Sequence, residues 1–317
     1  MHHITLRADG SGRGDGAGRW AEATIDLDAG ARLRRLTVGD ADEVVDILAE
    51  VPDDADPASS GWGSYPMAPW AGRLRHGRFD AHGARTVLRR NQRDGSGTGG
   101  GPISPSIDPI DGDTPPAADE RAHAIHGTVF ARRWQVVAQT GTSLIVTCSL
   151  SDSNEPLALG WPHAGIAQQR FNLAHDSIEC ELSVEFDDAS IPVVIGWHPW
   201  FAKPDRLSVA PDAEYEVDDI GLPTGRLITP SSPPWDTCFT NTTPATLHYD
   251  RRLASDVTVT SDCDHLVVYD KPAHATCVEP QSGPPDAVNL LARGAAPGAI
   301  EVAGIGQGVC HTMTISW

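Results

Sequence analysis

Strict alternation of apolar and polar residues over residues 177–186 most limits what this chain can fold into. Apolar side chains take every second position: Ile178, Cys180, Leu182, Val184 and Phe186. Serine and glutamate fill the positions between them. Because successive side chains of a strand point to opposite faces of a sheet, one face of this segment is suited to a core and the other to water. The pattern predicts a half-buried antiparallel strand.

The same period of two recurs along the chain, separated by glycine and proline turns. It is clear over residues 144–150, 257–259, 266–269 and 312–317, and residues 21–38 have the pattern of an opening hairpin. Residues 41–48 fit a short strand better than a helical turn, and only residues 286–291 suggest a helix. Many short strands with almost no helix predict an all-β fold, a large antiparallel β-sandwich.

The length of 317 residues allows one domain or two, because large β-sandwiches can form a single unit of well over 200 residues. Residues 93–120 are rich in Gly, Ser, Pro and Asp and poor in apolar groups, which predicts a long mobile loop. Since the strand-like segments on both sides of this loop are alike, we interpret it as an insertion. We therefore expect a single domain over residues 1–317 with a Gly/Pro-rich insertion at about 93–120.

The charge of the chain argues against two classes of partner. The 43 Asp and Glu outnumber the 24 Lys and Arg, and the formal net charge of −19 should repel nucleic acid and anionic membranes. No signal peptide or membrane-spanning apolar stretch is recognisable, so we expect a soluble, cytoplasmic protein. The six cysteines are scattered without a C-x-x-C pair and are expected to be reduced core thiols. The sequence carries no signal for an oligomeric state.

Residues 193–201, Val-Val-Ile-Gly-Trp-His-Pro-Trp-Phe, combine a β-branched run with an aromatic turn around one histidine. Pro199 disfavours helical geometry at the preceding residue, so His198 should be extended, with its imidazole projecting from the end of a strand. Trp197, Trp200 and Phe201 would then form the walls of a pocket suited to the apolar faces of a sugar ring. A histidine between aromatic residues is more often a buried structural residue, but imidazole titrates near neutral pH and suits acid/base chemistry.

Other polar groups lie in comparable surroundings. Glu279 follows an apolar run and precedes Pro280, and a carboxylate at the end of a buried strand has the raised pKa of a usable base. Taken alone, Glu279 could cap a turn, Asp236 could form an Asx turn, and Arg73 could form a surface ion pair. The pair His123 and His126 lacks the spacing of known metal motifs, so no metal site is predicted.

An ordered series of short motifs resembles the aldose 1-epimerase (galactose mutarotase) family from about residue 20 to the C-terminus. The motifs are Pro69-Trp70-Ala71-Gly72-Arg73-Leu74 with Gly77-Arg78-Phe79, His126-Gly127 before Trp134, Gly160-Trp161-Pro162, Gly196-Trp197-His198-Pro199-Trp200-Phe201, Gly221-Leu222-Pro223-Thr224-Gly225, Asp236-Thr237-Cys238-Phe239 and Cys277-Val278-Glu279-Pro280. Each motif is weak alone, whereas their order is specific.

This resemblance implies a galactose-mutarotase-like β-sandwich that interconverts the α and β anomers of a free hexose without a cofactor. It implies that Glu279 is the general base and His198 the general acid, and that Arg73, His126 and Asp236 hold the sugar hydroxyls. Many relatives carry Asn immediately before the matching arginine, where this chain has Gly72. One amide contact to the sugar is therefore missing.

Two alternative functions stay open on the sequence. A hexose-6-phosphate 1-epimerase would need a basic cluster for the phosphate, for which Arg75, Arg78, Arg132 and Arg133 are candidates. A non-catalytic sugar-binding module would keep the pocket without turnover.

Overall fold

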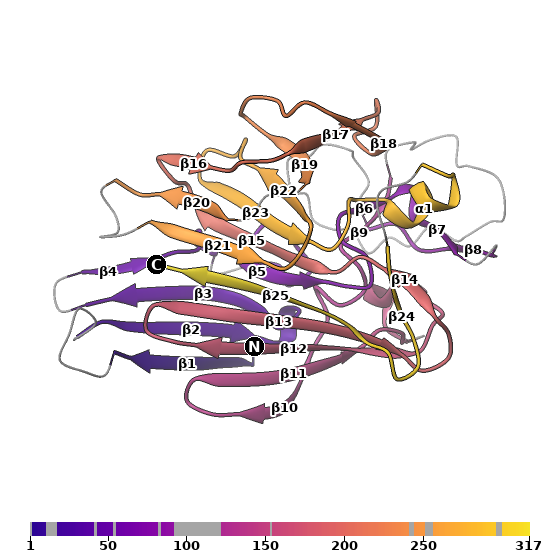
Figure 1. Cartoon of the computed structure of the whole chain (residues 1–317). Helices are drawn as coiled ribbons and strands as arrows, with labels where there is room; N and C mark the ends of the chain where they lie inside the picture. The colour runs from indigo at the N-terminus through magenta and orange to yellow at the C-terminus, as the bar shows by residue number, and fades with distance from the viewer. Residues whose placement is uncertain are drawn as a thin grey trace.

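Two large antiparallel sheets form the body of the protein. The computed structural model describes residues 2–10, 18–40, 43–52, 55–81, 84–91, 122–152, 154–240, 244–250, 256–295 and 300–317. The two sheets lie one over the other (Figure 1). The predicted all-β fold with large antiparallel sheets is confirmed.

The first sheet has 11 strands and carries the candidate site. Its strands are, in spatial order, β1 (His3–Asp9), β2 (Trp20–Asp26), β3 (Arg32–Gly39), β5 (Ser64–Met67), β15 (Gly196–Ala202), β23 (Ala275–Gln281), β22 (His265–Tyr269), β19 (Asp236–Thr240), β17 (Ala213–Val217) and β18 (Pro223–Ile228), with β4 (Val44–Asp46) paired to β3. The predicted hairpin of residues 21–38 is β2 and β3. The strand over residues 41–48 is confirmed as β4, whereas β1 was not predicted.

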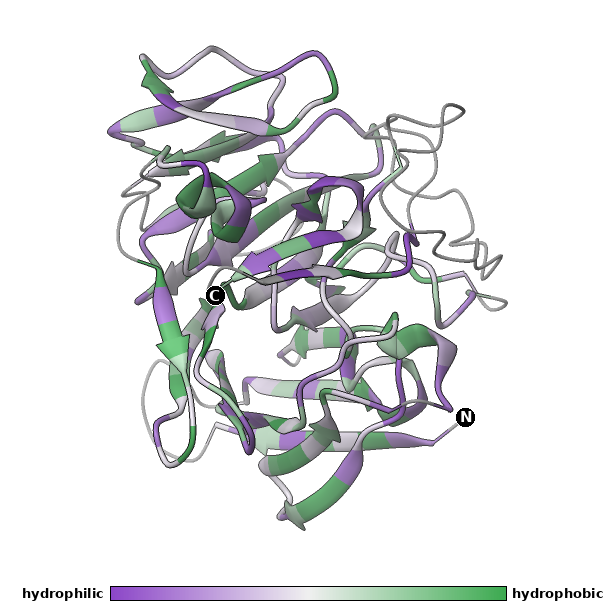
Figure 2. Ribbon diagram, turned by 90° about the vertical axis from the view of Figure 1, so that its right-hand side faces the viewer, coloured by the Kyte–Doolittle hydropathy of each residue, from purple (hydrophilic) through white to green (hydrophobic). Residues whose placement is uncertain are grey.

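The second sheet has eight strands and backs the first. Its spatial order is β10 (Gln135–Gln139), β11 (Ser143–Ser149), β12 (Gly165–Leu173), β13 (Ser177–Phe186), β25 (Val309–Ser316), β21 (Val257–Ser261), β20 (Ala245–His248) and β16 (Arg206–Ser208). β13 contains the alternating segment 177–186, and its five apolar side chains are all buried. Hydrophobic and hydrophilic bands alternate along the strands in Figure 2, as this period of two requires.

The remaining elements are short and lie outside the two large sheets. They are the strand pairs β6 (Arg73–Leu74) with β9 (Ala124–Ile125), β7 (Arg78–Ala81) with β8 (Ala84–Val87), and β14 (Ile191–Val193) with β24 (Glu301–Ala303), the helix α1 (Ala287–Ala292), and the 3₁₀ turns η1 (Leu27–Ala29), η2 (Arg75–Gly77) and η3 (Pro156–Ala158). The predicted helix at residues 286–291 is α1. Among the described residues, no helix has the length and apolar character needed to cross a membrane.

The main core lies between the two large sheets, and a smaller cluster lies on the outer face of the first sheet. The main core takes side chains such as Phe201 and Val278 from the first sheet and Phe171 and Leu182 from the second. The smaller cluster includes Tyr65, Met67, Trp200, Tyr269 and Cys277. Alternate residues of β15 and β23 thus enter different cores, and this separation determines which side chains are available to a site.

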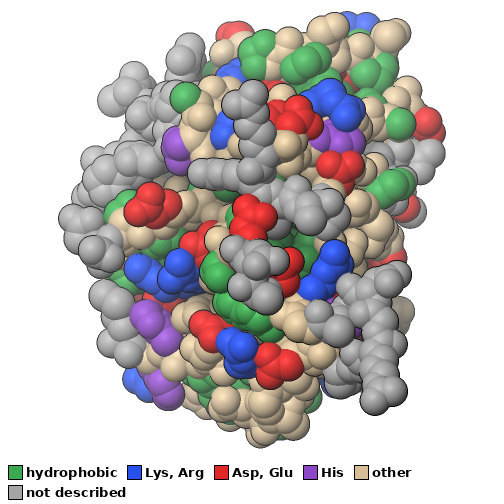
Figure 3. Space-filling model, turned by 90° about the vertical axis from the view of Figure 1, so that its left-hand side faces the viewer, with side chains coloured by type: hydrophobic (Ala, Val, Ile, Leu, Met, Phe, Trp, Pro, Cys, Tyr) green, Lys and Arg blue, Asp and Glu red, His purple; other side chains and the backbone are tan. Residues whose placement is uncertain are grey.

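Two sequence expectations concern segments outside these elements. The insertion at about 93–120 lies outside the described residues, so its mobility and the single-domain organisation stay predictions. The six cysteines are free thiols, and five of them are buried as expected, whereas Cys310 is exposed. Acidic, basic and histidine side chains are interspersed over the face drawn in Figure 3.

Candidate active site

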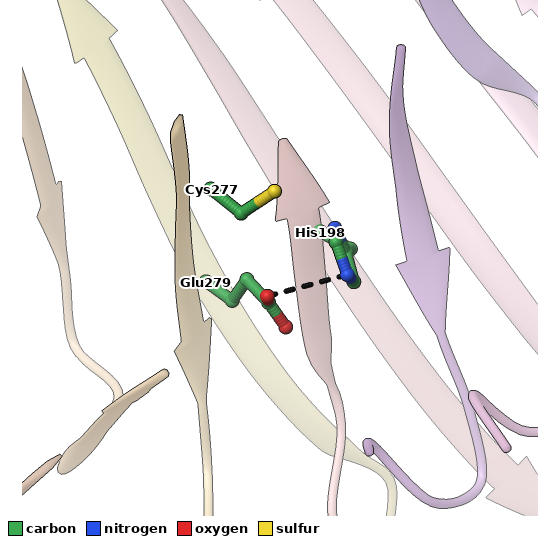
Figure 4. A group of neighbouring side chains, drawn as sticks. All are labelled: His198, Cys277 and Glu279. Carbon is green, nitrogen blue, oxygen red and sulfur yellow. Dashed lines mark ion pairs between the residues drawn. The ribbon is translucent and has the colours of Figure 1, made fainter. Parts of the chain in front are cut away.

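His198 and Glu279 are opposite each other on the neighbouring strands β15 and β23. Two residue pairs fix the register of these strands: Gly196 with Gln281, and Trp200 with Cys277. Because the strands are antiparallel, His198 and Glu279 form the pair midway between these two. Their side chains point to the same face of the sheet, and His198 Nε2 lies 3.2 Å from Glu279 Oε1 (Figure 4).

Two prolines interrupt the hydrogen-bond ladder between β15 and β23 beside this pair. The backbone N–H of Trp200 donates to the carbonyl of Gly63 on the β5 side, so the odd-numbered residues of β15 face β23. Pro199 and Pro280 therefore occupy positions where an N–H would have bridged the two strands, and neither has one. The paired positions of the register accordingly skip from Gly196 to Trp200.

This arrangement corrects the sequence prediction of two strand ends. His198 was expected at the end of a buried strand over residues 193–195, and Glu279 before a proline turn. Instead β14 ends at Val193, and both His198 and Glu279 lie inside strands. Proline indicated a turn in the sequence, but here it removes a ladder hydrogen bond and leaves the strand extended.

The aromatic walls are also only partly as predicted. Trp200 lies on the same face of β15 as His198 and lines the pocket. Trp197 and Phe201 point the other way and are 1% and 0% exposed in the main core. The prediction that all three would line a pocket was therefore wrong for these two, because side chains at odd and even positions of one strand cannot share a face.

The ring of His198 is held between two aromatic rings. The ring of Tyr65 stacks against it with centroids 4.9 Å apart, and the ring of Trp200 stacks at 5.5 Å. Behind Tyr65, the buried guanidinium of Arg32 lies 4.5 Å from the tyrosine ring and 3.9 Å from that of Trp62. Arg32 donates hydrogen bonds to the carbonyls of neighbouring loops, so the stack is anchored to the backbone.

Burial shifts both members of the pair toward their neutral forms. It raises the pKa of Glu279 well above its ordinary value, and the charge of Asp236 raises it further, whereas Arg73 and a hydrogen bond from Gln281 lower it. Burial lowers the pKa of His198 to about 3. Although the distance is that of an ion pair, burial favours a protonated carboxyl beside a neutral imidazole over carboxylate and imidazolium. A short proton transfer to Nε2 converts the pair to carboxylate and imidazolium.

All five residues named from the sequence line one pocket of about 90 Å³. Buried Glu279, His198 and His126 form its floor, and the partly exposed Arg73 and Asp236 lie at its rim. Its remaining lining residues are Ser60, Gly72, Ile125, Trp200, Val267, Tyr269, Gln281 and Pro285. The structure therefore brings together five residues that span more than 200 positions of the sequence.

His126 reaches the floor from a strained turn. Its φ is 61°, in the left-handed region that non-glycine residues seldom adopt. Gly127 follows with φ 78°, and a Cβ at this position would lie 1.9 Å from the carbonyl oxygen of Ala68. The ring of His126 meets that of His198 edge-on at 5.0 Å, and its Nδ1 has no hydrogen-bond partner among the described residues. A sugar hydroxyl could supply that partner.

Arg73 and Asp236 reach the pocket from different strands. Arg73 begins β6, which pairs with β9 just before His126. Asp236 begins β19 and accepts from Lys271 Nζ at 3.3 Å. A cation and an anion at one rim provide hydrogen-bond donors and acceptors for a polar ligand.

Gln281 is a site residue that the sequence prediction missed. It lies two positions beyond Glu279 on β23, on the same face, and is fully buried. Its Nε2 donates to Glu279 Oε2 at 3.3 Å. The signal was the period of two along 275–281, which was not used because the strand was expected to end at Pro280.

The structure explains the glycine at position 72. Gly72 has φ 65°, and a Cβ there would lie 2.7 Å from Cγ of Pro285. The ring of Pro285 therefore occupies the space that an amide side chain would need. Pro285 and Gly72 make this part of the pocket wall apolar.

Two groups of side chains among the described residues have the geometry to hold a metal ion. They are His198 with Cys277 and Glu279, and Asp262 with Cys263 and His311. His123 belongs to neither group. Its Nδ1 accepts from the backbone N–H of His76, and burial lowers its pKa to about 3.

Comparison with known proteins places this chain in a family. The family model described as aldose 1-epimerase matches residues 109–289, which is more than half of the chain. The chain belongs to the aldose 1-epimerase family. No curated protein matched the sequence.

Solved structures show that the fold is galactose-mutarotase-like. A putative aldose 1-epimerase from Escherichia coli K12 is 15% identical with a TM-score of 0.70, covering 99% of each chain. An aldose epimerase homologue from C. elegans is 14% identical with a TM-score of 0.73, covering 99% of this chain and 98% of its own. A galactose 1-epimerase from Lactobacillus acidophilus NCFM is 15% identical with a TM-score of 0.60, again covering 99% and 98%. At these identities the likeness extends to the fold alone.

Proposed function

We propose that the protein is an aldose 1-epimerase that interconverts the α and β anomers of a free hexose. The observation that carries this proposal is the contact of 3.2 Å between His198 Nε2 and Glu279 Oε1 on the floor of one pocket. Mutarotation needs an acid and a base at two oxygens bonded to the same carbon, the C1 hydroxyl and the ring oxygen. An acid and a base that lie side by side fit this requirement.

The reaction uses the proton shared by the pair. Transfer of that proton from Glu279 to His198 gives a carboxylate and an imidazolium. The carboxylate takes the proton of the C1 hydroxyl while the imidazolium protonates the ring oxygen, so the C1–O5 bond breaks and the open-chain aldehyde forms. After rotation about C1–C2, the two groups exchange roles and the ring closes on the other face. Each positioned proton transfer typically contributes about 10²–10⁴-fold in rate.

Arg73, His126 and Asp236 are assigned to binding and orientation of the sugar. They surround the acid/base pair at the rim and the floor of the pocket. A cavity of about 90 Å³ is smaller than the roughly 150 Å³ of a cavity that holds benzene, so only part of a pyranose ring fits inside. The rest of the ring would contact the partly exposed residues of the rim.

The contacts of three of the four candidate phosphate-binding arginines favour a neutral sugar, and the fourth, Arg78, is not among the residues that line the pocket. Arg75 Nη2 lies 2.5 Å from Asp218 Oδ2, and its Nε lies 3.4 Å from Asp286 Oδ2. Arg132 donates to the carbonyl of Ser149, and Arg133 lies 3.6 Å from Asp28. Carboxylates and carbonyls thus already neutralise or engage these three side chains.

Polarimetry on freshly dissolved α-D-glucose and α-D-galactose tests the proposal. We expect the protein to accelerate the approach to the equilibrium rotation, and the absence of acceleration over a panel of aldoses would refute it. The mutarotation rates on glucose and glucose 6-phosphate distinguish the free-hexose enzyme from a hexose-6-phosphate 1-epimerase. The phosphosugar alternative predicts the higher rate on glucose 6-phosphate. If the protein is a non-catalytic module, the wild type binds sugar but shows no turnover, and Glu279→Gln therefore changes no rate.

A further inference from the structure

Cys277 places a thiol beside the acid/base pair. It lies two positions before Glu279 on the same face of β23, and the mechanism proposed above does not use it. The sulfur of Cys277, a ring nitrogen of His198 and a carboxylate oxygen of Glu279 all lie within 4.8 Å of one another (Figure 4). The three residues are 0%, 6% and 3% exposed.

These donor atoms suit a thiophilic divalent cation. Zinc binds cysteine sulfur, histidine nitrogen and carboxylate oxygen, and ligands at about 2.0–2.3 Å in a tetrahedron lie roughly 3.3–3.7 Å apart. His198 Nε2 and Glu279 Oε1 lie 3.2 Å apart, and the sulfur of Cys277 lies within 4.8 Å of a donor atom of each residue. Three protein ligands would leave the fourth position open to water in the pocket.

Charge and protonation in the buried site are compatible with this ligation. A thiolate and a carboxylate together neutralise a divalent cation, so the complex adds no net charge to a site of low polarity. Burial lowers the pKa of His198 to about 3, and its neutral ring has a lone pair available for a metal. Cysteine and glutamic acid bind a metal ion as thiolate and carboxylate, so each releases a proton on binding.

We propose that His198, Cys277 and Glu279 form a zinc-binding site, and that the bound ion reversibly blocks the pocket. The part of this proposal that concerns inhibition rests on the proposed epimerase function, whereas metal binding does not. The ion would occupy the nitrogen and the oxygen that transfer protons, so sugar turnover and metal binding exclude each other.

Cobalt(II) titration of the full-length protein tests the binding. Co²⁺ bound to a thiolate gives a sulfur-to-metal charge-transfer band in the near ultraviolet, and we expect this band for the wild type. The variants Cys277→Ala and Cys277→Ser should lose the band or bind Co²⁺ at least about 100-fold more weakly. If the band is unchanged in both variants, the assignment is wrong.

Cys263→Ser is the matched control, because Cys263 belongs to the second group of possible ligands, with Asp262 and His311. It should leave the band of the first site intact. A band that disappears in Cys263→Ser and persists in Cys277→Ala would place the ion in the second group and overturn the proposal. Circular dichroism of each variant establishes that the fold is kept.

Inhibition is then measured by polarimetry with added Zn²⁺ and reversal by EDTA. We expect Zn²⁺ to inhibit the wild type and Cys263→Ser, and the inhibition constant to rise at least about 100-fold in Cys277→Ala. Equal inhibition of the wild type and Cys277→Ala would contradict the proposal. A protein without epimerase activity that still shows the cobalt band would refute the proposed function and leave the metal site standing.

Discussion

Glu279 lies directly opposite His198 across a stretch where Pro199 and Pro280 remove hydrogen bonds between β15 and β23. The register pairs on either side are intact, so the two strands are held together at both ends of the gap. A sheet that is paired on both sides of the gap thus supports the acid/base pair. Catalytic groups on rigid elements keep their geometry better than groups on loops.

Gln281→Met should impair catalysis by changing the ionisation of Glu279. The hydrogen bond from Gln281 lowers the pKa of Glu279, so its loss should raise that pKa further and leave less carboxylate at neutral pH. We expect kcat at pH 7 to fall about tenfold and the rising limb of the pH–rate profile to move to higher pH. Gln169→Met, a buried change on β12 in the other sheet, should leave the profile unchanged. A Gln281→Met profile identical to that of the wild type would exclude this role.

Gly72→Asn should not restore the amide contact that many relatives have. The backbone at position 72 is in the left-handed region, and Pro285 occupies the space for a side chain. We expect a loss of about 1–3 kcal/mol in unfolding free energy and a higher KM for galactose. The double variant Gly72→Asn with Pro285→Gly should recover part of the loss in KM. If Gly72→Asn alone has a lower KM and unchanged stability, Pro285 does not block the space beside position 72.

Arg32→Lys should destabilise the protein and reduce its activity. Burial lowers the pKa of Arg32 to about 10, so the guanidinium stays charged at neutral pH and donates to several loop carbonyls. The single ammonium group of a lysine cannot reach all of these carbonyls. Each buried carbonyl that is left unpaired lowers the unfolding free energy by about 1–3 kcal/mol. We expect at least about 2 kcal/mol of destabilisation in urea unfolding. Arg34→Lys on the same strand is the control, and equal effects of the two changes would refute the proposed anchoring role.

Stability should fall as the pH drops below about 6.5. Burial lowers the pKa of His265 to about 4, so between pH 6.5 and 4 the unfolded chain binds a proton that the folded chain does not. This single residue should cost on the order of 2 kcal/mol at pH 5. His265→Gln can keep the contact with Tyr215 and should flatten the dependence of Tm on pH. The control His175→Gln, at a partly exposed position, should not. Parallel Tm curves for the wild type and His265→Gln would contradict the linkage.

The sequence predicted the sandwich because alternation is a local property. In β13 every apolar side chain of residues 177–186 is buried, as a period of two requires. The positions of Arg73, His126, His198, Asp236 and Glu279 around one pocket were inferred from motif order, since residues so far apart carry no local signal of contact. Their catalytic and binding roles stay predictions until activity is measured.

The wrong predictions arose at prolines, which occur both in turns and within strands that lack a ladder hydrogen bond. Pro199 and Pro280 were read as turns, but both lie in central strands, and Trp197 was therefore assigned to the pocket although it faces the core. Contacts such as that of Pro285 with Gly72 could not be predicted, because they depend on how distant segments pack.

Polarimetry on α-D-galactose with wild type, Glu279→Gln and His198→Asn tests the central claim most directly. Glutamine matches glutamate in shape and is neutral, as burial favours at position 279, so this variant should fold and still bind sugar. The account predicts that the wild type accelerates mutarotation and that each variant loses about 10²–10⁴-fold in rate. A Glu279→Gln or His198→Asn protein that keeps the wild-type rate would contradict it.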